Sequence, residues 1–227
     1  MTLNHDLVEI LRAIPSFAGL EKTILEALAN AAIQRNYENR QVIFLEGEAC
    51  AGYHIVQDGW LKAVKISTTG REQIIQFLGP GNTFNEESII NETKNQVTVE
   101  ALELSKVWVI QRESMLKLMD EYPALSRIIT EALANRVIHL TNIIENLALQ
   151  TVEARLARIF LEHSSNEIMK RRRWSTQAEM AARLGTVPDV LNRALRSLAE
   201  ENLIKIQRHE IQILDRKGLE RKAMQTD

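Results

Sequence analysis

The residues best suited to recognising another molecule lie between Ser175 and Ile206. Asp189, Asn192, Arg193 and Arg196 share one face of a predicted helix, opposite an apolar stripe. An arginine can donate two hydrogen bonds to O6 and N7 of guanine, and a carboxylate can accept one from the cytosine amino group. This set of side chains therefore predicts a helix that reads base edges in the DNA major groove.

Two short helices at a tight turn would present that face. Thr176 can cap the first helix, with Glu179 completing a capping box. Gly185 ends it where a positive φ is useful, and Pro188 begins the second helix where its missing N–H has no cost. The inward positions are apolar: Met180, Ala181, Leu184, Val190, Leu191, Ala194, Leu195 and Leu198. The pattern is typical of a helix-turn-helix, although a plain helical hairpin would read the same.

Cations and a small hairpin flank this helix pair. Ile204–Gln207 and Ile211–Leu214 alternate around a polar turn and predict a wing, and Arg216–Met224 predicts a terminal helix. We expect phosphate contacts, which set affinity and salt sensitivity and carry no sequence preference. The residues concerned are Thr176, Arg171, Arg172, Arg173, Arg196 and Arg208. The run Lys170–Arg173 has an ordinary solvated loop as its alternative.

The charge balance differs between the two parts of the chain. From Gln150 to the end there are 15 Lys and Arg against 11 Asp and Glu, whereas the preceding part has 13 against 19. This asymmetry fits one nucleic-acid domain and one domain of another kind. The single cysteine, Cys50, excludes an intramolecular disulfide, and no segment reads as a signal peptide or a membrane span. We therefore expect a cytoplasmic protein that does not enter membranes.

The preceding chain shows three patterns in succession. Helical spacing from Asp6 to Ala32 gives way, from Tyr37 to Ile110, to short runs rich in Val, Ile and aromatics with glycine between them. Many short strands with regular turn signals predict an antiparallel barrel or sandwich. Helical spacing returns from Arg112 to Leu149, and Pro123 interrupts it once.

The long helical stretch contains a heptad seam of apolar residues. The seam consists of Leu133, Val137, Leu140, Ile144 and Leu147. A second apolar side is formed by Ile128, Ile129, Ala132 and Ile143. Such a helix can lie on its own barrel and also pair with a second copy, so we expect a parallel two-fold dimer. The alternative is that both stripes belong to the core of one chain. Asn146–Thr151 is the expected joint to the C-terminal part.

Two blocks and the order of the segments resemble the cyclic AMP receptor protein/FNR (CRP/FNR) family of bacterial transcription regulators. The blocks are QVIFLEGEACAGYHIVQDGWLKAV with GREQIIQFLGPGNTF, and STQAEMAARLGTVPDVLNRALRSLAEENLI. The resemblance implies an α+β fold: helices and an antiparallel β-roll of the cyclic-nucleotide-binding, jelly-roll kind over 1–111, a dimerisation helix region over 112–149, and a winged helix-turn-helix over 150–227. It covers essentially the whole chain.

The same resemblance assigns roles. It places Asp189 at a base-reading glutamate and Arg193 at a guanine-reading arginine, and Asn192 could supply a further contact. It implies a homodimer that reads pseudo-palindromic half-sites about 34 Å apart, and contact with RNA polymerase if the regulator is an activator. Pro188 stands where some members carry an arginine, and Asp189 is one methylene shorter than the glutamate of the family.

The sensor part departs from the family's cyclic-nucleotide binders. Those members present a Gly-Glu pair and, about ten residues later, an Arg-Ser or Arg-Thr pair for the phosphate. Here Asn85 precedes Glu86, and Asn95-Gln96 stands where the second pair would be. Lys94 is the single cation from Asn82 to Leu104. A buried phosphate needs charged donors or several amides. We therefore expect an effector other than cyclic AMP, in a pocket of Phe84, Asn85, Glu86, Asn95, Gln96 and Thr141.

Other sensing chemistries find little support in the sequence. An iron–sulfur cluster needs about four cysteines, so one cysteine excludes it. Haem is possible but unsupported, because nothing selects His54, His139 or Cys50 as an axial ligand, and no cofactor is predicted. A lone Cys50 is a weak signal for a thiol sensor. No paired nucleophile and base occurs and no cupin-like metal set is formed, so we expect no enzyme.

Two further readings remain open. One is a regulator of the same family that needs no effector. The other is a ligand-binding regulatory module whose C-terminal domain contacts protein instead of DNA. Salt-dependent DNA binding separates the second reading from the DNA-binding prediction.

Overall fold

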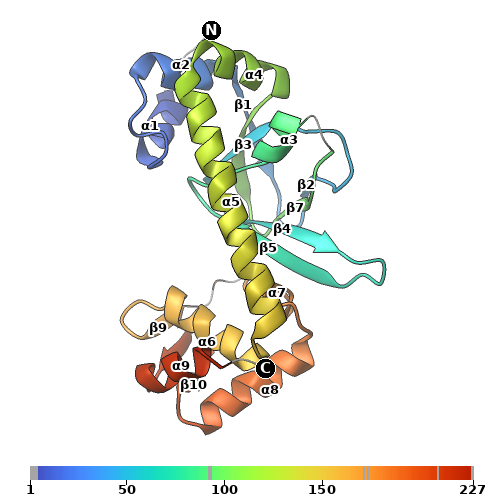
Figure 1. Ribbon diagram of the computed structural model, residues 1–227, viewed down its shortest axis with the longest axis vertical. Helices are drawn as coiled ribbons and strands as arrows, with labels where there is room; N and C mark the ends of the chain where they lie inside the picture. Colours follow the sequence, from blue (N-terminus) through green and yellow to red (C-terminus); the bar gives the residue numbers. More distant parts are fainter. Residues whose placement is uncertain (1–4, 92–93, 171, 173, 209, 226–227) are drawn as a thin grey trace. The chain divides into compact units, whose positions relative to one another are not determined.

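The computed structural model describes residues 5–91, 94–170, 172, 174–208 and 210–225. The chain forms two compact units, which are described one at a time. The first unit consists of Met1–Lys65 and Ile75–His139, and the second of Ile66–Ile74 and Leu140–Asp227. One long helix, α5 (Pro123–Leu149), begins in the first unit and ends in the second (Figure 1).

The first unit is built on two four-stranded sheets in which the described strand pairs are antiparallel. One sheet has the order β1 (Ala32–Tyr37), β8 (Ser105–Ile110), β3 (Tyr53–Asp58), β6 (Thr83–Phe84). The other has the order β2 (Val42–Phe44), β7 (Thr98–Ala101), β4 (Leu61–Ile66), β5 (Glu72–Leu78). Residues of both sheets share one apolar core, so the sheets face each other as a β-roll.

Strand β8 shows how the sequence divides two cores. Side chains alternate across a strand. Val107 and Val109 enter the core between the sheets, whereas Trp108 and Ile110 enter a second core on the opposite face. Both faces of this strand are therefore apolar, which explains its continuous Val, Ile and Trp composition.

Helices form the second core of the first unit. The helices are α1 (His5–Ala13), α2 (Lys22–Ala31), α4 (Arg112–Glu121) and the start of α5, which Figure 1 shows gathered together. Their apolar faces cover the sheet around Tyr53 and Trp108. Ile128 and Ile129, on the predicted second apolar side of α5, are buried there. The short helix α3 (Glu86–Asn91) follows directly after β6.

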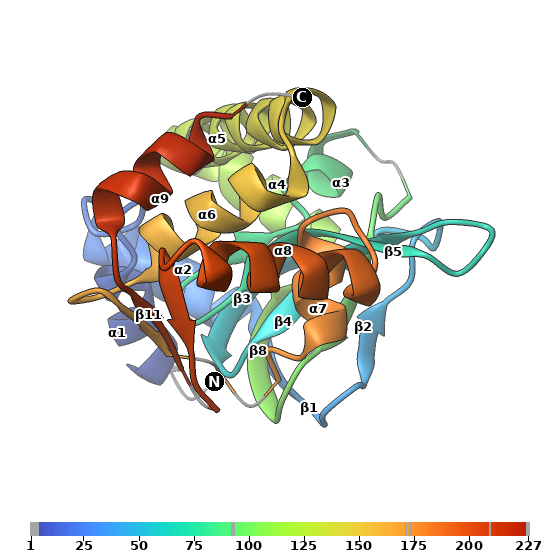
Figure 2. The same cartoon turned by 90° about the horizontal axis from the view of Figure 1, so that it is seen from below.

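The second unit contains the predicted winged helix-turn-helix. Its elements are α6 (Val152–His163), β9 (Ile168–Lys170), α7 (Gln177–Arg183), α8 (Pro188–Glu200), β10 (Ile204–Ile206), β11 (Glu210–Ile213) and α9 (Arg216–Ala223). Figure 2 shows α6 beside α9 and α7 beside α8. Strand β9, which was not predicted from the sequence, pairs with β11 and ends at Lys170. A three-residue strand is too short to give a period-two signal.

The joint is shorter than the sequence predicted. Helix α5 continues to Leu149, and α6 begins at Val152. The break is therefore confined to Gln150 and Thr151, instead of Asn146–Thr151. Thr151 ends the connection because its hydroxyl accepts a hydrogen bond from Ala154 N at 3.1 Å, which caps α6.

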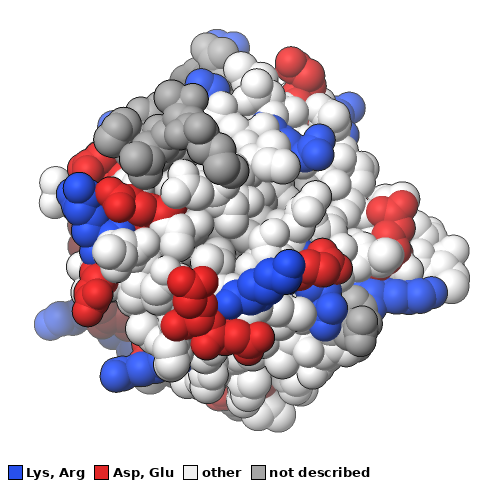
Figure 3. Space-filling model, turned by 90° about the horizontal axis from the view of Figure 1, so that it is seen from above, with Lys and Arg blue, Asp and Glu red and all other residues white. Residues whose placement is uncertain are grey.

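The observed architecture confirms the predicted α+β fold class. Among the described residues, no helix is long and apolar enough to cross a membrane. On the face seen in Figure 3, Lys and Arg side chains are interspersed with Asp and Glu, and neither sign dominates. Mixed charges of both signs are typical of a solvated surface. A surface that binds a phosphate backbone carries clustered cations instead.

Candidate nucleic-acid interface and sensor site

Helix α8 has one buried face and one exposed face. Leu191, Ala194, Leu195 and Leu198 are buried in the core of the second unit. On the opposite face, Asp189, Arg193 and Arg196 are exposed and Asn192 is half-buried. The four polar residues thus form one surface on a helix whose position is fixed by its apolar side. Their proposed base and phosphate contacts remain predictions.

The helix pair forms through local signals that the sequence analysis identified. The Thr176 hydroxyl accepts a hydrogen bond from Glu179 N at 3.2 Å and so caps α7. Gly185 has φ +67°, the left-handed conformation that glycine adopts without a Cβ clash. Thr186 N then donates to Ala181 O at 2.9 Å, which closes the turn before Pro188 begins α8.

The other predicted DNA contacts lie near this helix pair in the sequence. Thr176, Arg172 and Arg208 are exposed, as phosphate contacts require. Arg171 and Arg173 lie outside the described residues. The side-chain nitrogen of Asn192 is 3.5 Å from Gln177 Oε1, so the start of α7 contacts the outer face of α8. Gln177 was not singled out from the sequence, because nothing local links the two positions.

The predicted dimer seam is open to solvent along most of its length. The exposed fractions of Val137 and Ile144 are 64% and 67%, and Leu140 and Leu147 are also exposed. Leu133 differs, because it is half-buried and packs against the helical core of its own unit. An apolar row on a long helix is costly in water and suits a partner surface.

The proposed sensor pocket contains two buried carboxamides in direct contact. Asn85 and Asn95 are 3% and 1% exposed, and Asn85 Nδ2 donates to Asn95 Oδ1 at 3.3 Å. Asn85 has φ +75°, which asparagine tolerates better than most residues. Gln96 is exposed and donates to the Lys94 carbonyl, so it lies outside this pair. Thr141 is exposed and belongs to the second unit.

Beside the carboxamides, a buried carboxylate faces an arginine of α5. Glu86 accepts a hydrogen bond from Thr83 Oγ1 at 2.7 Å, and its Oε2 lies 3.8 Å from Arg136 Nη2. Burial raises the pKa of Glu86, while the Thr83 hydrogen bond and Arg136 act in the opposite direction. Arg136 also donates to Gln76 Oε1 on β5.

No role was predicted from the sequence for Arg136, Thr83 or Gln76. One signal was available. Arg136 and His139 follow Ile129 and Ala132 at helical spacing, on the side of α5 that packs inward. His139 Nε2 lies 2.9 Å from Ile75 O, so it too contacts β5. Arg136 and His139 thus connect α5 to strand β5 of the β-roll.

His54 is packed inside the β-roll. It is 1% exposed and stacks on Phe84 with ring centroids 4.7 Å apart, with Phe44 5.3 Å away. Burial lowers the pKa of His54 from 6.5 to about 4, so the ring is neutral near pH 7. A neutral, packed histidine fits this environment, in which charging the ring is unfavourable.

This burial predicts an acid-sensitive fold. Between the lowered folded pKa and 6.5, the unfolded chain binds a proton at His54 that the folded chain does not, so stability falls as pH falls. We expect the His54 contribution to cost about 2 kcal/mol between about pH 7 and pH 5. Urea unfolding of the parent and of His54→Phe, which keeps an aromatic ring, measures the difference. An equal pH slope in the two chains would contradict the prediction.

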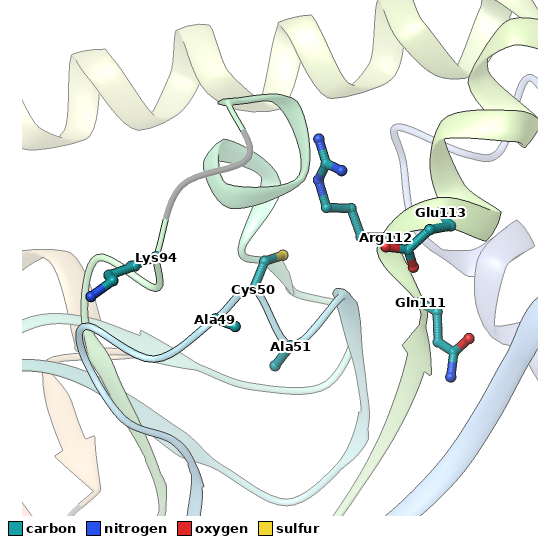
Figure 4. A pocket seen from close by; sticks show the side chains of 7 residues that line it. All are labelled: Ala49, Cys50, Ala51, Lys94, Gln111, Arg112 and Glu113. Atoms are coloured by element: carbon teal, nitrogen blue, oxygen red, sulfur yellow. The ribbon is translucent and has the colours of Figure 1, made fainter.

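Cys50 borders a surface hollow next to the carboxamides. The hollow has a volume of about 590 Å³ and is lined by Ala49, Cys50, Ala51, Lys94, Gln111, Arg112 and Glu113. Figure 4 shows the Cys50 sulfur turned toward the side of Arg112, while Lys94 and Gln111 point away from each other. Burial raises the pKa of the Cys50 thiol, which disfavours the reactive thiolate. The side chains do not converge on one point, so the hollow shows no built binding site.

Known proteins share both units of this chain. Residues 34–122 match the cyclic nucleotide-binding domain, and residues 154–222 match the Crp-like helix-turn-helix domain. A relative named cyclic AMP receptor protein, from Thermus thermophilus, is 24% identical over 199 residues, which is 86% of this chain and 90% of the relative. The CRP-like cAMP-activated global transcriptional regulator of Mycobacterium tuberculosis is 23% identical, over 95% of this chain and 99% of its own.

A solved structure shares the fold. FixK2 from Bradyrhizobium japonicum has a TM-score of 0.75 at 20% identity, covering 86% of this chain and 99% of its own. A nucleotide-binding-type β-roll followed by a helix-turn-helix defines a DNA-binding transcription regulator with a sensor domain. The chain belongs to the CRP/FNR family of transcription regulators. This family consists of regulators, not of enzymes.

Proposed function

We propose that this regulator binds double-stranded DNA as a homodimer and reads pseudo-palindromic sites with the exposed face of α8. The observation that carries the proposal is that face: Asp189, Asn192 and Arg193 lie together, outside the core that holds the helix. Arg193 would donate to guanine, and Asp189 would accept from cytosine. Arg196, Thr176 and the neighbouring cations would contact phosphates.

The exposed row on α5 supports the dimer. Two copies in parallel would bury Val137, Leu140, Ile144 and Leu147 against each other. A two-fold dimer carries two copies of α8, which matches a pseudo-palindrome with half-sites one helical turn apart. As an activator the dimer would also contact RNA polymerase, and the cytoplasm is the compartment that this role requires.

Cyclic AMP would not be the effector of this regulator. Asn95 stands where a phosphate-binding arginine would be expected by resemblance, and its amide already donates to main-chain carbonyls. A buried phosphate would find no cation of the described residues at this position. Two relatives are named for cyclic AMP, yet each shares only about a quarter of its residues with this chain.

Fluorescence anisotropy with a labelled DNA duplex tests the proposal. If six to ten phosphates are contacted, affinity should fall by about 10³–10⁵ between 50 mM and 200 mM salt. Millimolar cyclic AMP should leave the dissociation constant unchanged. An affinity that does not change with salt concentration, or no binding at all, would contradict the proposal that the protein binds DNA. If cyclic AMP lowers the dissociation constant for DNA, only the proposal that cyclic AMP is not the effector is contradicted.

A further inference from the structure

The Asn85 and Asn95 side chains connect three segments that are far apart in the sequence. Asn85 Nδ2 donates to Gly52 O at 3.0 Å and to Asn95 Oδ1 at 3.3 Å. Asn95 Nδ2 donates to Leu45 O at 3.3 Å and to Ala49 O at 3.2 Å. The loop 45–52, the start of α3 and the turn before β7 are thereby held together. We call these two residues the carboxamide clamp.

The main chain strengthens the same connection. Asn95 N donates to Glu48 O at 2.8 Å, and Gly47 N donates to Asn95 O at 2.9 Å. Asn95 is therefore bound to the loop through its backbone and through its side chain. Because the residue is 99% shielded from water, loss of these bonds would leave buried polar groups unsatisfied.

Counting donors shows what the clamp excludes. A carboxamide has two N–H groups. The Asn85 amide nitrogen is directed to Gly52 O, Asn95 Oδ1 and, at 3.7 Å, Cys50 Sγ, and the Asn95 amide nitrogen is directed to Leu45 O and Ala49 O. Among the side-chain atoms of these two residues, Asn85 Oδ1 is buried without a hydrogen-bond partner, and it is an acceptor. An anion needs donors, so the clamp offers a phosphate or carboxylate ligand nothing to bind.

The clamp is connected to the long helix through α3. Asn85 immediately precedes Glu86, and Glu86 faces Arg136 of α5 at 3.8 Å. Arg136 also reaches β5 through Gln76. The position of α3 therefore decides whether this contact with α5 is made. Helix α5 also carries the exposed apolar row of the proposed dimer.

We propose that the carboxamide clamp takes the place of a sensor ligand: it holds α3 against α5 permanently, so DNA binding needs no small molecule. Asn85 and Asn95 are then positioning residues that act through Glu86 and Arg136. This inference rests on the proposed DNA-binding function. In this proposal the sensor domain stays in one closed state, so the amount of the protein controls how much DNA is bound.

Two substitutions test the clamp in the full-length chain. Asn85→Gly removes the carboxamide and keeps a residue that tolerates φ +75°. Asn95→Ala removes the other carboxamide. Gln96→Ala is the matched control, because Gln96 is an exposed neighbour whose amide contacts the adjacent Lys94 carbonyl. Each variant is compared by anisotropy on DNA at a temperature at which thermal melting shows it folded.

We expect Asn85→Gly and Asn95→Ala to weaken DNA binding at least about tenfold, and the double variant to be no weaker than the weaker single variant. In these variants, hydrogen exchange should rise in α3 and in the part of α5 around Arg136. The DNA affinity of Gln96→Ala should stay within about twofold of that of the parent. Native mass spectrometry of the DNA-binding parent should show polypeptide without a retained small molecule.

Several results would overturn the clamp. DNA affinity within about twofold of the parent in Asn85→Gly, tighter binding, or a retained small molecule would each do so. If Asn95→Ala fails to fold, Asn85→Gly alone decides. The parent and Arg193→Ala distinguish this failure from failure of the proposed function. Suppose that the parent and the clamp variants bind DNA and Arg193→Ala does not. The proposed DNA-binding function then stands, and only the clamp proposal is wrong.

Discussion

Arg193→Ala is expected to weaken binding to a specific operator by about 2–6 kcal/mol, since each bidentate arginine–guanine contact contributes about 1–3 kcal/mol and the dimer makes it twice. The loss corresponds to about 30-fold or more in the dissociation constant. Arg193 is exposed on α8 and does not contribute to the core, so the fold should be retained. Sequence preference should relax at the guanine that it reads.

Arg196→Ala is the control for that result. It lies on the same face of α8 and is assigned to a phosphate. Its removal should weaken binding to all duplexes about equally and reduce the salt slope by about one. Anisotropy on a matched and a substituted operator separates the two effects. An Arg193→Ala chain with unaltered affinity and preference would show that this residue does not read DNA.

Ile144→Glu should convert the protein to a monomer. Ile144 is 67% exposed in one chain and is the most exposed residue of the proposed seam. In a parallel two-fold dimer it would meet its own copy, so two carboxylates would be buried together. An unpaired buried charge costs about 3–5 kcal/mol, and the dimer would carry two, so its dissociation constant should rise more than about a thousandfold.

Sedimentation equilibrium measures the mass of the assembly directly. Asn142→Glu adds the same charge to the same helix outside the seam and should remain dimeric. DNA binding should weaken in Ile144→Glu, because a monomer presents one copy of α8 to two half-sites. A dimeric Ile144→Glu protein would place the interface elsewhere.

Local patterns made the helix-turn-helix predictable. The cap at Thr176, the positive φ at Gly185 and the apolar stripe of α8 each depend on residues within a few positions of one another. Their energies are set by local geometry, so spacing alone reveals them. The heptad row on α5 is local in the same sense, and Val137, Leu140, Ile144 and Leu147 of that row are exposed in the structure.

The sensor site could not be derived in the same way. The Asn95 side chain reaches Leu45 across 50 positions, and Arg136 reaches Gln76 across 60. The first pair is brought together by the pairing of β2 with β7 and the second by the contact of α5 with β5, neither of which a single sequence displays. The sequence indicated that Asn85 and Asn95 depart from a phosphate-binding pattern. Their mutual hydrogen bond and the role of Arg136 required the fold.

The measurement that tests the central claim most directly is selection of duplexes from a random DNA pool by the purified full-length protein, followed by sequencing. We predict enrichment of a pseudo-palindromic motif whose two half-sites are about 10–10.5 bp apart, centre to centre, without any added effector. Arg193→Ala should lose a guanine preference in both halves together. Failure to enrich any motif, or enrichment of a single unrepeated half-site, would contradict a two-fold reader built on α8.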